Sequence, residues 1–238
     1  MVTVDTIQTE LEGLSAKEGL AWLASQRLNV AFSTALGEED QAITHLIATQ
    51  ALDIRIFTLD TGRLFPETYD LMALTQAKYK LSIQTFFPER ARVEAYVNEK
   101  GINGFYDSVD NRKACCHLRK VEPLTRALNG VEVWVTGLRA AQSANRQQMK
   151  KVEWDESMKV VKYNPLLDWS DADLRTYLQQ HAIPVNTLHK KGFASIGCAP
   201  CTRAIAPGED PRAGRWWWES SAKECGLHET KISAAAAR

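Results

Sequence analysis

Five cysteines are the residues of this chain best suited to chemistry. Four form two pairs, the adjacent Cys115 and Cys116 and the turn Cys198-Ala199-Pro200-Cys201, and the fifth, Cys225, stands alone near the end. In a cytoplasmic protein this spacing favours metal ligation or redox chemistry over disulfides. A thiolate is both a soft metal ligand and a nucleophile, so any interpretation has to explain four paired cysteines and one that stands alone.

Two kinds of metal centre compete for the four paired cysteines. Adjacent cysteines such as Cys115 and Cys116 point in divergent directions on most backbones, which makes it hard for both to reach one zinc ion. A cubane cluster spreads its thiolates over separate iron atoms, so the spacing favours a four-iron cluster over zinc. Nearby Lys113, Arg119 and Lys120 suit an anionic centre, although a solvated basic helix face would carry the same residues. Core packing is the alternative for any single cysteine.

The elements that must position these cysteines alternate between short apolar runs and helical segments. This alternation predicts an α/β fold, an open and mostly parallel sheet with helices on both faces. We expect one α/β unit over 1–205, with a helical lead-in over 1–26, and a mobile catalytic tail over 206–238, because Gly, Pro, Arg and Trp dominate late in the chain. The expected strands are 28–32, 54–59, 81–87, 131–136 and 160–163, and the expected helices follow Gly37, Pro66, Phe87 and Trp169.

Small, hydroxylated or basic residues follow three of the expected strands. They are Ser33 after the first strand, Thr61 and Gly62 after the second, and Gly137 and Arg139 after the fourth. Ligands of open parallel sheets bind beyond the carboxyl ends of the strands, so these residues predict an anion-binding rim. Ser33 would offer its hydroxyl and nearby backbone N–H groups to a phosphate.

Composition excludes several classes of partner. The 29 basic and 29 acidic residues cancel, so no overall field attracts nucleic acid or a membrane surface. No run approaches the roughly 20 apolar residues of a membrane span, and the first residues do not resemble a signal peptide. We expect a cytoplasmic protein that binds neither nucleic acid nor membrane. Trp216, Trp217 and Trp218 are expected to pack the tail against the body rather than to stack on bases.

Four segments resemble the bacterial assimilatory adenylyl-sulfate reductases. Residues 114–124 and 196–202 are similar to the two cluster segments of that family, 207–219 to its C-terminal signature and 223–228 to its catalytic tail. Residues 58–63 and 136–139 are similar to its substrate-binding loops, and the resemblance extends over about 28–230. It implies a four-iron, four-sulfur cluster on Cys115, Cys116, Cys198 and Cys201, a nucleophilic Cys225, and a fold related to the PP-loop adenine-nucleotide pyrophosphatases.

The resemblance also implies a reaction. The Cys225 thiolate would take the sulfonate sulfur from adenosine 5′-phosphosulfate and release AMP, and thioredoxin or a glutaredoxin-like dithiol would then release sulfite. The anion would be held by cationic side chains, for which we nominate Lys120, Arg139, Arg146, Arg212, Arg215 and His228. Arg146 and His228 are interpreted equally well as ordinary surface residues. Family members are often homo-oligomers, which makes an oligomer a further expectation.

Three alternatives stay open. The chain could reduce the 3′-phosphorylated nucleotide or both nucleotides, although enzymes of that type commonly lack the paired cysteines. It could be a non-catalytic metal-binding module, which would have no use for Cys225. It could be a PP-loop enzyme acting on tRNA or ATP. The turn 33–40 argues against this alternative, because it lacks the paired glycines of a pyrophosphate-binding loop.

Overall fold

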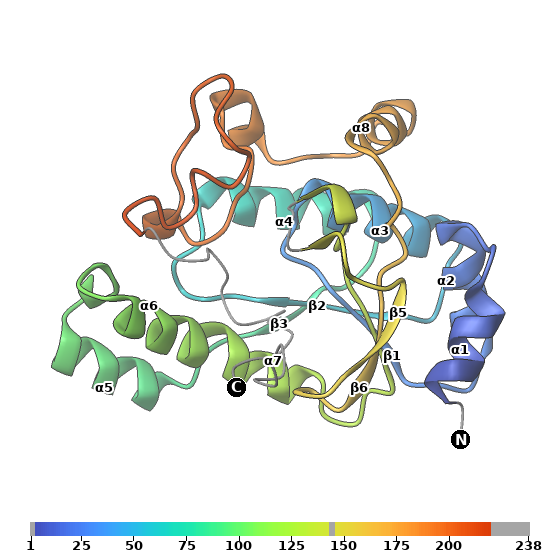
Figure 1. Ribbon diagram of the computed structural model, residues 1–238, viewed down its shortest axis with the longest axis horizontal. Helices are drawn as coiled ribbons and strands as arrows, with labels where there is room; N and C mark the ends of the chain where they lie inside the picture. The colour runs from blue at the N-terminus through green and yellow to red at the C-terminus, as the bar shows by residue number, and fades with distance from the viewer. Residues whose placement is uncertain (1–2, 143–145, 220–238) are drawn as a thin grey trace, which may run out of the picture.

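The centre of the molecule is a six-stranded sheet in the order β3-β2-β1-β4-β6-β5 (Figure 1). The computed structural model describes residues 3–142 and 146–219. Five strands run parallel, and β5 pairs antiparallel with β6 at one edge. The strands are β1 (Val30–Ser33), β2 (Arg55–Leu59), β3 (Gln84–Phe86), β4 (Val133–Val135), β5 (Val152–Asp155) and β6 (Val160–Tyr163).

Helices cover both faces of this sheet. In Figure 1, α3 and α4 lie above it and α5 to α7 below it. Alternate residues of β1 show why the strands are apolar throughout, because Val30 and Phe32 join the larger core while Ala31 joins the core against α7. The helices are α1 (Val4–Leu11), α2 (Ala16–Ser25), α3 (Glu38–Thr49), α4 (Pro66–Tyr79), α5 (Arg90–Lys100), α6 (Val109–Cys116), α7 (Glu122–Ala127) and α8 (Asp171–Gln180).

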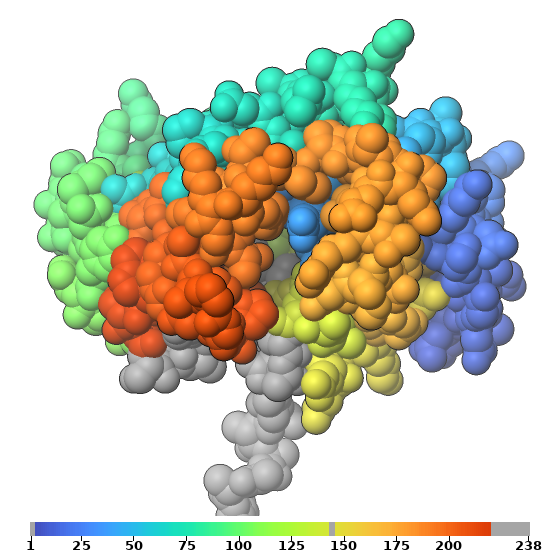
Figure 2. Space-filling view, turned by 90° about the horizontal axis from the view of Figure 1, so that it is seen from above, coloured from blue at the N-terminus to red at the C-terminus, as the bar shows by residue number. Residues whose placement is uncertain are grey.

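The strand order reverses beside β1. From β1 the chain moves outward through β2 and β3, and it then returns to the other side of β1 with β4. Such a reversal opens a crevice at the carboxyl ends of the two central strands, where ligands of these folds bind. The space-filling view shows the surface hollowed between α8 and the segment around 190–215 (Figure 2).

The expected α/β architecture is confirmed, with local differences. The helical lead-in is two helices, because Gly13 adopts a left-handed φ of 73° and Ser15 begins α2 with a capping box. Strand β5 was not predicted. In the first part of the expected tail, residues 206–211 are exposed, whereas residues 214–216 and Glu219 are buried, and Trp216 is 1% exposed. Within the described ranges, no helix is long and apolar enough to cross a membrane.

Candidate active site and cysteine centre

The first cysteine pair lies at a distortion in a helix. Ser108 caps α6 by accepting a hydrogen bond from the Asn111 N–H, and Cys115 and Cys116 end this helix. The chain continues into α7 through a π-helical turn over His117–Val121. Such wide turns interrupt a helix most often at functional sites. Here the turn carries Lys120 toward the same cavity as the two thiols.

The second pair is fixed to the loop after β2. Cys198 and Cys201 flank a short 3₁₀ turn over Ala199–Cys201, and the Ala199 N–H donates to the Arg63 carbonyl at 2.8 Å. The Thr61 hydroxyl lies 3.3 Å from the Cys198 Sγ. Arg119, beside the first pair, donates to the Thr61 carbonyl at 2.6 Å. The loop that sequence analysis assigned to substrate therefore also joins the two cysteine segments.

All four thiols line one cavity. Cys115, Cys116, Cys198 and Cys201 are unbridged, and the first is partly exposed while the other three are buried. The remaining lining is strongly basic and is supplied by Arg63, Phe105, Arg112, Arg119, Lys120 and Pro200. In the described part of the chain, no three His, Cys, Asp or Glu side chains form a group that could hold one metal ion.

The pKa values of the thiols at this cavity are shifted in different directions. Burial alone would raise the pKa of Cys198, but Lys120, the Thr61 hydroxyl, Arg215 and Arg119 favour the thiolate and lower that pKa overall. Burial and the neighbouring Cys198 raise the pKa of Cys201 to about 12. The positive side chains are therefore placed to stabilise negative sulfur in the cavity.

Four buried N–H donors near the cysteines have no partner among the described residues. They belong to Arg119 Nε, Arg215 Nε, Trp216 Nε1 and Trp218 Nε1. Trp216 and Trp218 pack in the same buried cluster as the cysteines. Buried donors are normally satisfied, so these four remain able to donate to an acceptor-rich group.

The tail signature packs against the second cysteine segment. The Trp216 N–H donates to the Cys201 carbonyl at 3.2 Å, and Thr202 forms an isolated antiparallel bridge with Arg215. Arg215 is buried, with its guanidinium 4.7 Å from the Trp216 ring centroid. This packing requires glycine at 197, because a Cβ there would come within 2.6 Å of the Arg215 Cζ. Arg212 is half-buried beside it.

The hydroxyl of Ser33 is at the predicted place, but the backbone cradle is not. The Trp134 indole donates to the Ser33 Oγ at 2.8 Å, which leaves this hydroxyl able to donate. The Ala35 and Gly37 N–H groups already donate to the Asp40 carboxylate, and the Leu36 N–H donates to Thr34. The expectation that backbone N–H groups after Ser33 bind a phosphate stays a prediction, and for these three it would require a change of partners.

Asp40 explains this difference. It is the third residue of α3 and reaches back over its own helix N-terminus, the usual place for a capping acid. Burial raises its pKa to about 7, and Glu39 adds to the effect. Gly137 is needed beside it, because a Cβ at 137 would overlap the Asp40 carboxylate. The crevice between β1 and β4 is thus packed closely at its base.

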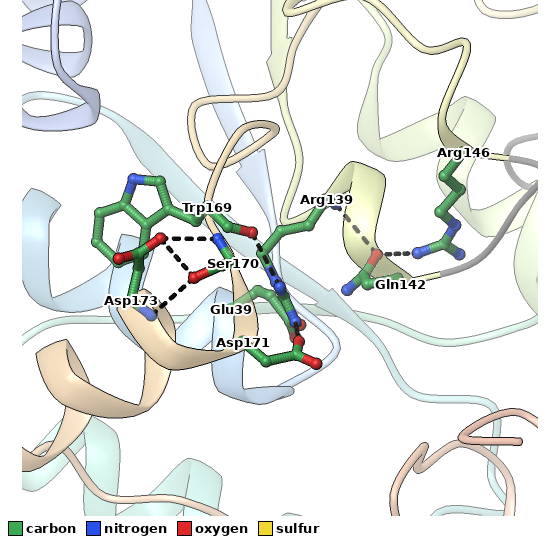
Figure 3. Close-up of polar contacts among 8 residues, drawn as sticks. All are labelled: Glu39, Arg139, Gln142, Arg146, Trp169, Ser170, Asp171 and Asp173. Carbon is green, nitrogen blue, oxygen red and sulfur yellow. Dashed lines mark hydrogen bonds and ion pairs between the residues drawn. The ribbon is translucent and has the colours of Figure 1, made fainter.

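Arg139 reaches the rim but is engaged by protein groups (Figure 3). Its guanidinium donates to Glu39 at 2.9 Å, to Asp171 at 2.7 Å and to the Trp169 carbonyl at 3.0 Å. It therefore joins α3 to the start of α8 across the crevice. The expected contact between Arg139 and substrate stays a prediction, and it would require a change of partners.

Arg146 lies on the same side of the crevice. The Gln142 side chain accepts hydrogen bonds from the Arg146 guanidinium and from the Arg139 N–H. Lys120 instead lines the cysteine cavity, the Thr61 hydroxyl and Arg215 lie close enough to act on Cys198, and the Gly62 N–H donates to Asp60. Cys225 and His228 lie outside the described residues, so their roles stay predictions.

Sequence reasoning missed the acidic partners of this site. It gave no role to Glu39 and Asp171, whose carboxylates bind Arg139, or to Glu219, whose carboxylate binds Arg112. Asp40 lies three positions after Gly37, where an acidic side chain commonly binds backbone N–H groups at the start of a helix, so this contact could have been predicted from the sequence. No local signal pointed to the pairs formed across the fold.

The fold and its rim define a parallel α/β protein of nucleotide-binding type with a cysteine centre beside its crevice. Residues 29–204 match the sequence profile described as the phosphoadenosine phosphosulfate reductase domain, and the chain belongs to this family. A relative from Burkholderia cepacia named adenosine 5′-phosphosulfate reductase is 50% identical over 90% of this chain and 86% of its own. One of the same name from Allochromatium vinosum is 46% identical over 98% and 90%.

Solved structures agree with this assignment. The phosphoadenylyl-sulfate reductase of Candida auris, crystallised with phosphate, superposes with a TM-score of 0.72 at 28% identity, covering 85% of this chain and 96% of its own. The FMN adenylyltransferase of Candida glabrata, in complex with ATP, superposes with a TM-score of 0.55 at 17% identity over 87% and 66%. The second likeness concerns the fold alone, and it is the architecture expected from the PP-loop resemblance.

Proposed function

We propose that this protein reduces adenosine 5′-phosphosulfate to sulfite and AMP through an S-sulfocysteine at Cys225. The observation that carries the proposal is the cavity at which both cysteine pairs meet Lys120 and Arg119 beside the crevice. The relatives at 46–50% identity, named adenosine 5′-phosphosulfate reductase, support the choice of nucleotide. A cytoplasmic location, a homo-oligomer and a division into 1–205 and 206–238 remain parts of the proposal.

A four-iron cluster fits the cysteine centre. Cys115, Cys116, Cys198 and Cys201 would hold it, since four thiols around one cavity can each bind a separate iron atom. The four unpartnered N–H donors suit the sulfur atoms of such a group, and the basic lining offsets its negative charge. When bound, the cluster organises this centre and adds to the field that acts on the sulfate through Lys120.

The first chemical step forms a bond between two sulfur atoms. The Cys225 thiolate attacks the sulfonate sulfur, the bond from that sulfur to the bridging oxygen breaks, and AMP leaves with the electron pair. The substrate's negative charge must be held during this attack. We assign that task to Arg215 and Lys120 at the cavity, with Ser33, Arg146 and Arg212 on the adjoining surfaces.

The second step needs a dithiol partner, which we propose to be thioredoxin or a glutaredoxin-like protein. One of its thiolates attacks the Cys225 sulfur, and sulfite leaves with the electron pair. The second thiol of the partner then resolves the mixed disulfide, which returns Cys225 as a thiol and leaves the partner oxidised. Both electrons for the reduction come from the dithiol.

An intact-mass experiment tests this function. Protein purified without oxygen is incubated with adenosine 5′-phosphosulfate and no reductant, and we expect one added SO₃ on Cys225 that thioredoxin discharges as sulfite. An adduct formed only with the 3′-phosphorylated nucleotide would instead support the rival reductase that the Candida auris structure represents. No adduct with either nucleotide, from protein that retains its metal, would favour a non-catalytic metal-binding module.

A further inference from the structure

A buried ion pair joins the cysteine helix to Glu219, the last residue of the described C-terminal segment. Arg112 Nε donates to Glu219 Oε1 at 3.0 Å, and its Nη2 donates to Oε2 at 2.9 Å. The two side chains are only 1% and 3% exposed. Arg203 and Glu209 form a forked ion pair of the same geometry in this segment, but their side chains are exposed at the surface.

Arg112 also contacts the cysteine centre. It lies one helical turn before Cys116 on α6 and hydrogen-bonds the Cys116 side chain. Its guanidinium stacks 4.9 Å from the Trp216 ring centroid, and Arg215 lies 4.7 Å from the same centroid. The Arg112 guanidinium therefore contacts Cys116, the Trp216 indole and the Glu219 carboxylate.

Glu219 lies close to Cys225 in the sequence, so the ion pair with Arg112 restricts where Cys225 can reach. Cys225 follows six residues later, so an extended chain lets its Cα reach at most about 20 Å from Glu219. A forked, buried pair fixes both the position and the direction of the backbone at Glu219. Loss of the pair would let the starting point of the tail move, and small errors in the position of a reacting group reduce rates strongly.

We propose that Arg112 is a positioning residue, which ties the tail to the cysteine helix through Glu219 and so sets the point from which Cys225 approaches the substrate. This inference rests on the proposed function, because it assumes that Cys225 is the nucleophile. It assigns Arg112 and Glu219 no contact with the nucleotide. Their effect is therefore on the rate of sulfur transfer and not on the affinity for substrate.

The test compares E219Q, E219D and R112K with the wild type in the full, metal-containing chain. E209Q is the matched control, because it breaks a forked arginine pair of the same segment at the surface. Single-turnover mass spectrometry gives the rate of SO₃ transfer to Cys225 and the half-saturating concentration of adenosine 5′-phosphosulfate. Hydrogen exchange over 210–219, measured without nucleotide, reports how firmly the segment is anchored.

We expect E219Q and R112K to slow SO₃ transfer by about 10- to 100-fold at saturating substrate. The half-saturating concentration should stay unchanged, exchange over 210–219 should be faster, and metal content should be retained. E219D should recover part of the rate because it keeps the charge, and E209Q should match the wild type. If E219Q does not fold, R112K and E219D decide the question with the charges preserved.

Three results would overturn the inference, and a fourth would refute the proposed function on which it rests. Transfer at the wild-type rate in E219Q, with faster exchange, would show that the anchor has no catalytic role. A change confined to the half-saturating concentration would show that the pair supports binding through Arg215. A wild-type protein that forms no adduct would refute the proposed function itself, and unchanged exchange in E219Q would separately refute the anchoring.

Discussion

Replacing Gly197 with alanine would test how the cysteine loop holds Arg215. The new Cβ would lie 2.6 Å from Cζ and 2.8 Å from Nη1 of Arg215, well inside van der Waals contact. The loop is fixed nearby by the Ala199 hydrogen bond to Arg63, so the flexible guanidinium must move rather than the backbone. Alanine at 197 should therefore displace the cation that we assign to the substrate anion.

The cost follows from the contact that is lost. A hydrogen bond to a charged group contributes about 1.5–3 kcal/mol, which corresponds to about 10- to 150-fold in affinity. We expect G197A to weaken binding of adenosine 5′-phosphosulfate by that factor. Equilibrium binding is measured in a Cys225→Ser background, where the nucleotide binds without transferring its sulfonate.

A double-mutant cycle decides whether the reasoning is right. If the methyl group acts by moving the guanidinium, G197A should have little further effect once Arg215 is replaced by alanine. Equal losses from G197A with and without Arg215 would refute the reasoning and place the effect in the loop backbone. Wild-type affinity in G197A would show that Arg215 does not bind the anion.

Three further perturbations have defined outcomes. The Asp40 pKa is raised from 3.8 to about 7, so its protonation stabilises the fold at low pH and this contribution is lost as the pH rises through 7. Between pH 6 and 8 the free energy of unfolding of the wild type should therefore fall by about 1.4 kcal/mol more than that of Asp40→Asn. Urea titrations measure both values, and an equal fall in the two proteins would contradict this prediction. Tyr163→Phe removes a buried hydroxyl that has no partner among the described residues, so the free energy of unfolding should rise by about 1 kcal/mol and Tm by about 2–4 °C in thermal melts. Cys198→Ser removes one thiol of the centre, and bound iron and inorganic sulfide should fall together in metal analysis; zinc without sulfide in the wild type would favour the rival centre.

Much of the sheet was predictable because its strands are locally encoded. The run Val30, Ala31 and Phe32 is apolar on both faces, as a buried parallel strand must be, and the sheet buries it on both sides. Strand β5 escaped prediction because Val152-Glu153-Trp154-Asp155 is only four residues long, which is too short for its alternation of apolar and polar residues to be distinctive. Its identity depends on pairing with β6, which the local pattern does not specify.

The candidate site was predictable in its cysteines and less so in its charges. Spacing alone grouped the two cysteine pairs, and the structure places all four at one cavity. The partners of Arg139 and Arg112 come from residues 32 to 107 positions away, and arginine and glutamate are usually expected at the surface. Only the fold shows that the Arg112–Glu219 pair is buried, and that Arg139 already has carboxylate partners.

The position of the cysteines along the chain has a consequence for synthesis on the ribosome. All six strands and the first cysteine pair precede residue 164, whereas Cys198 and Cys201 emerge only later. Domains fold from the N-terminal side as they are made, so the sheet can close while half of the cysteine centre is still missing. Insertion of the proposed cluster would thereby follow sheet formation, and a nascent chain stalled after α8 would present the thiols of Cys115 and Cys116 to the cell's oxidants.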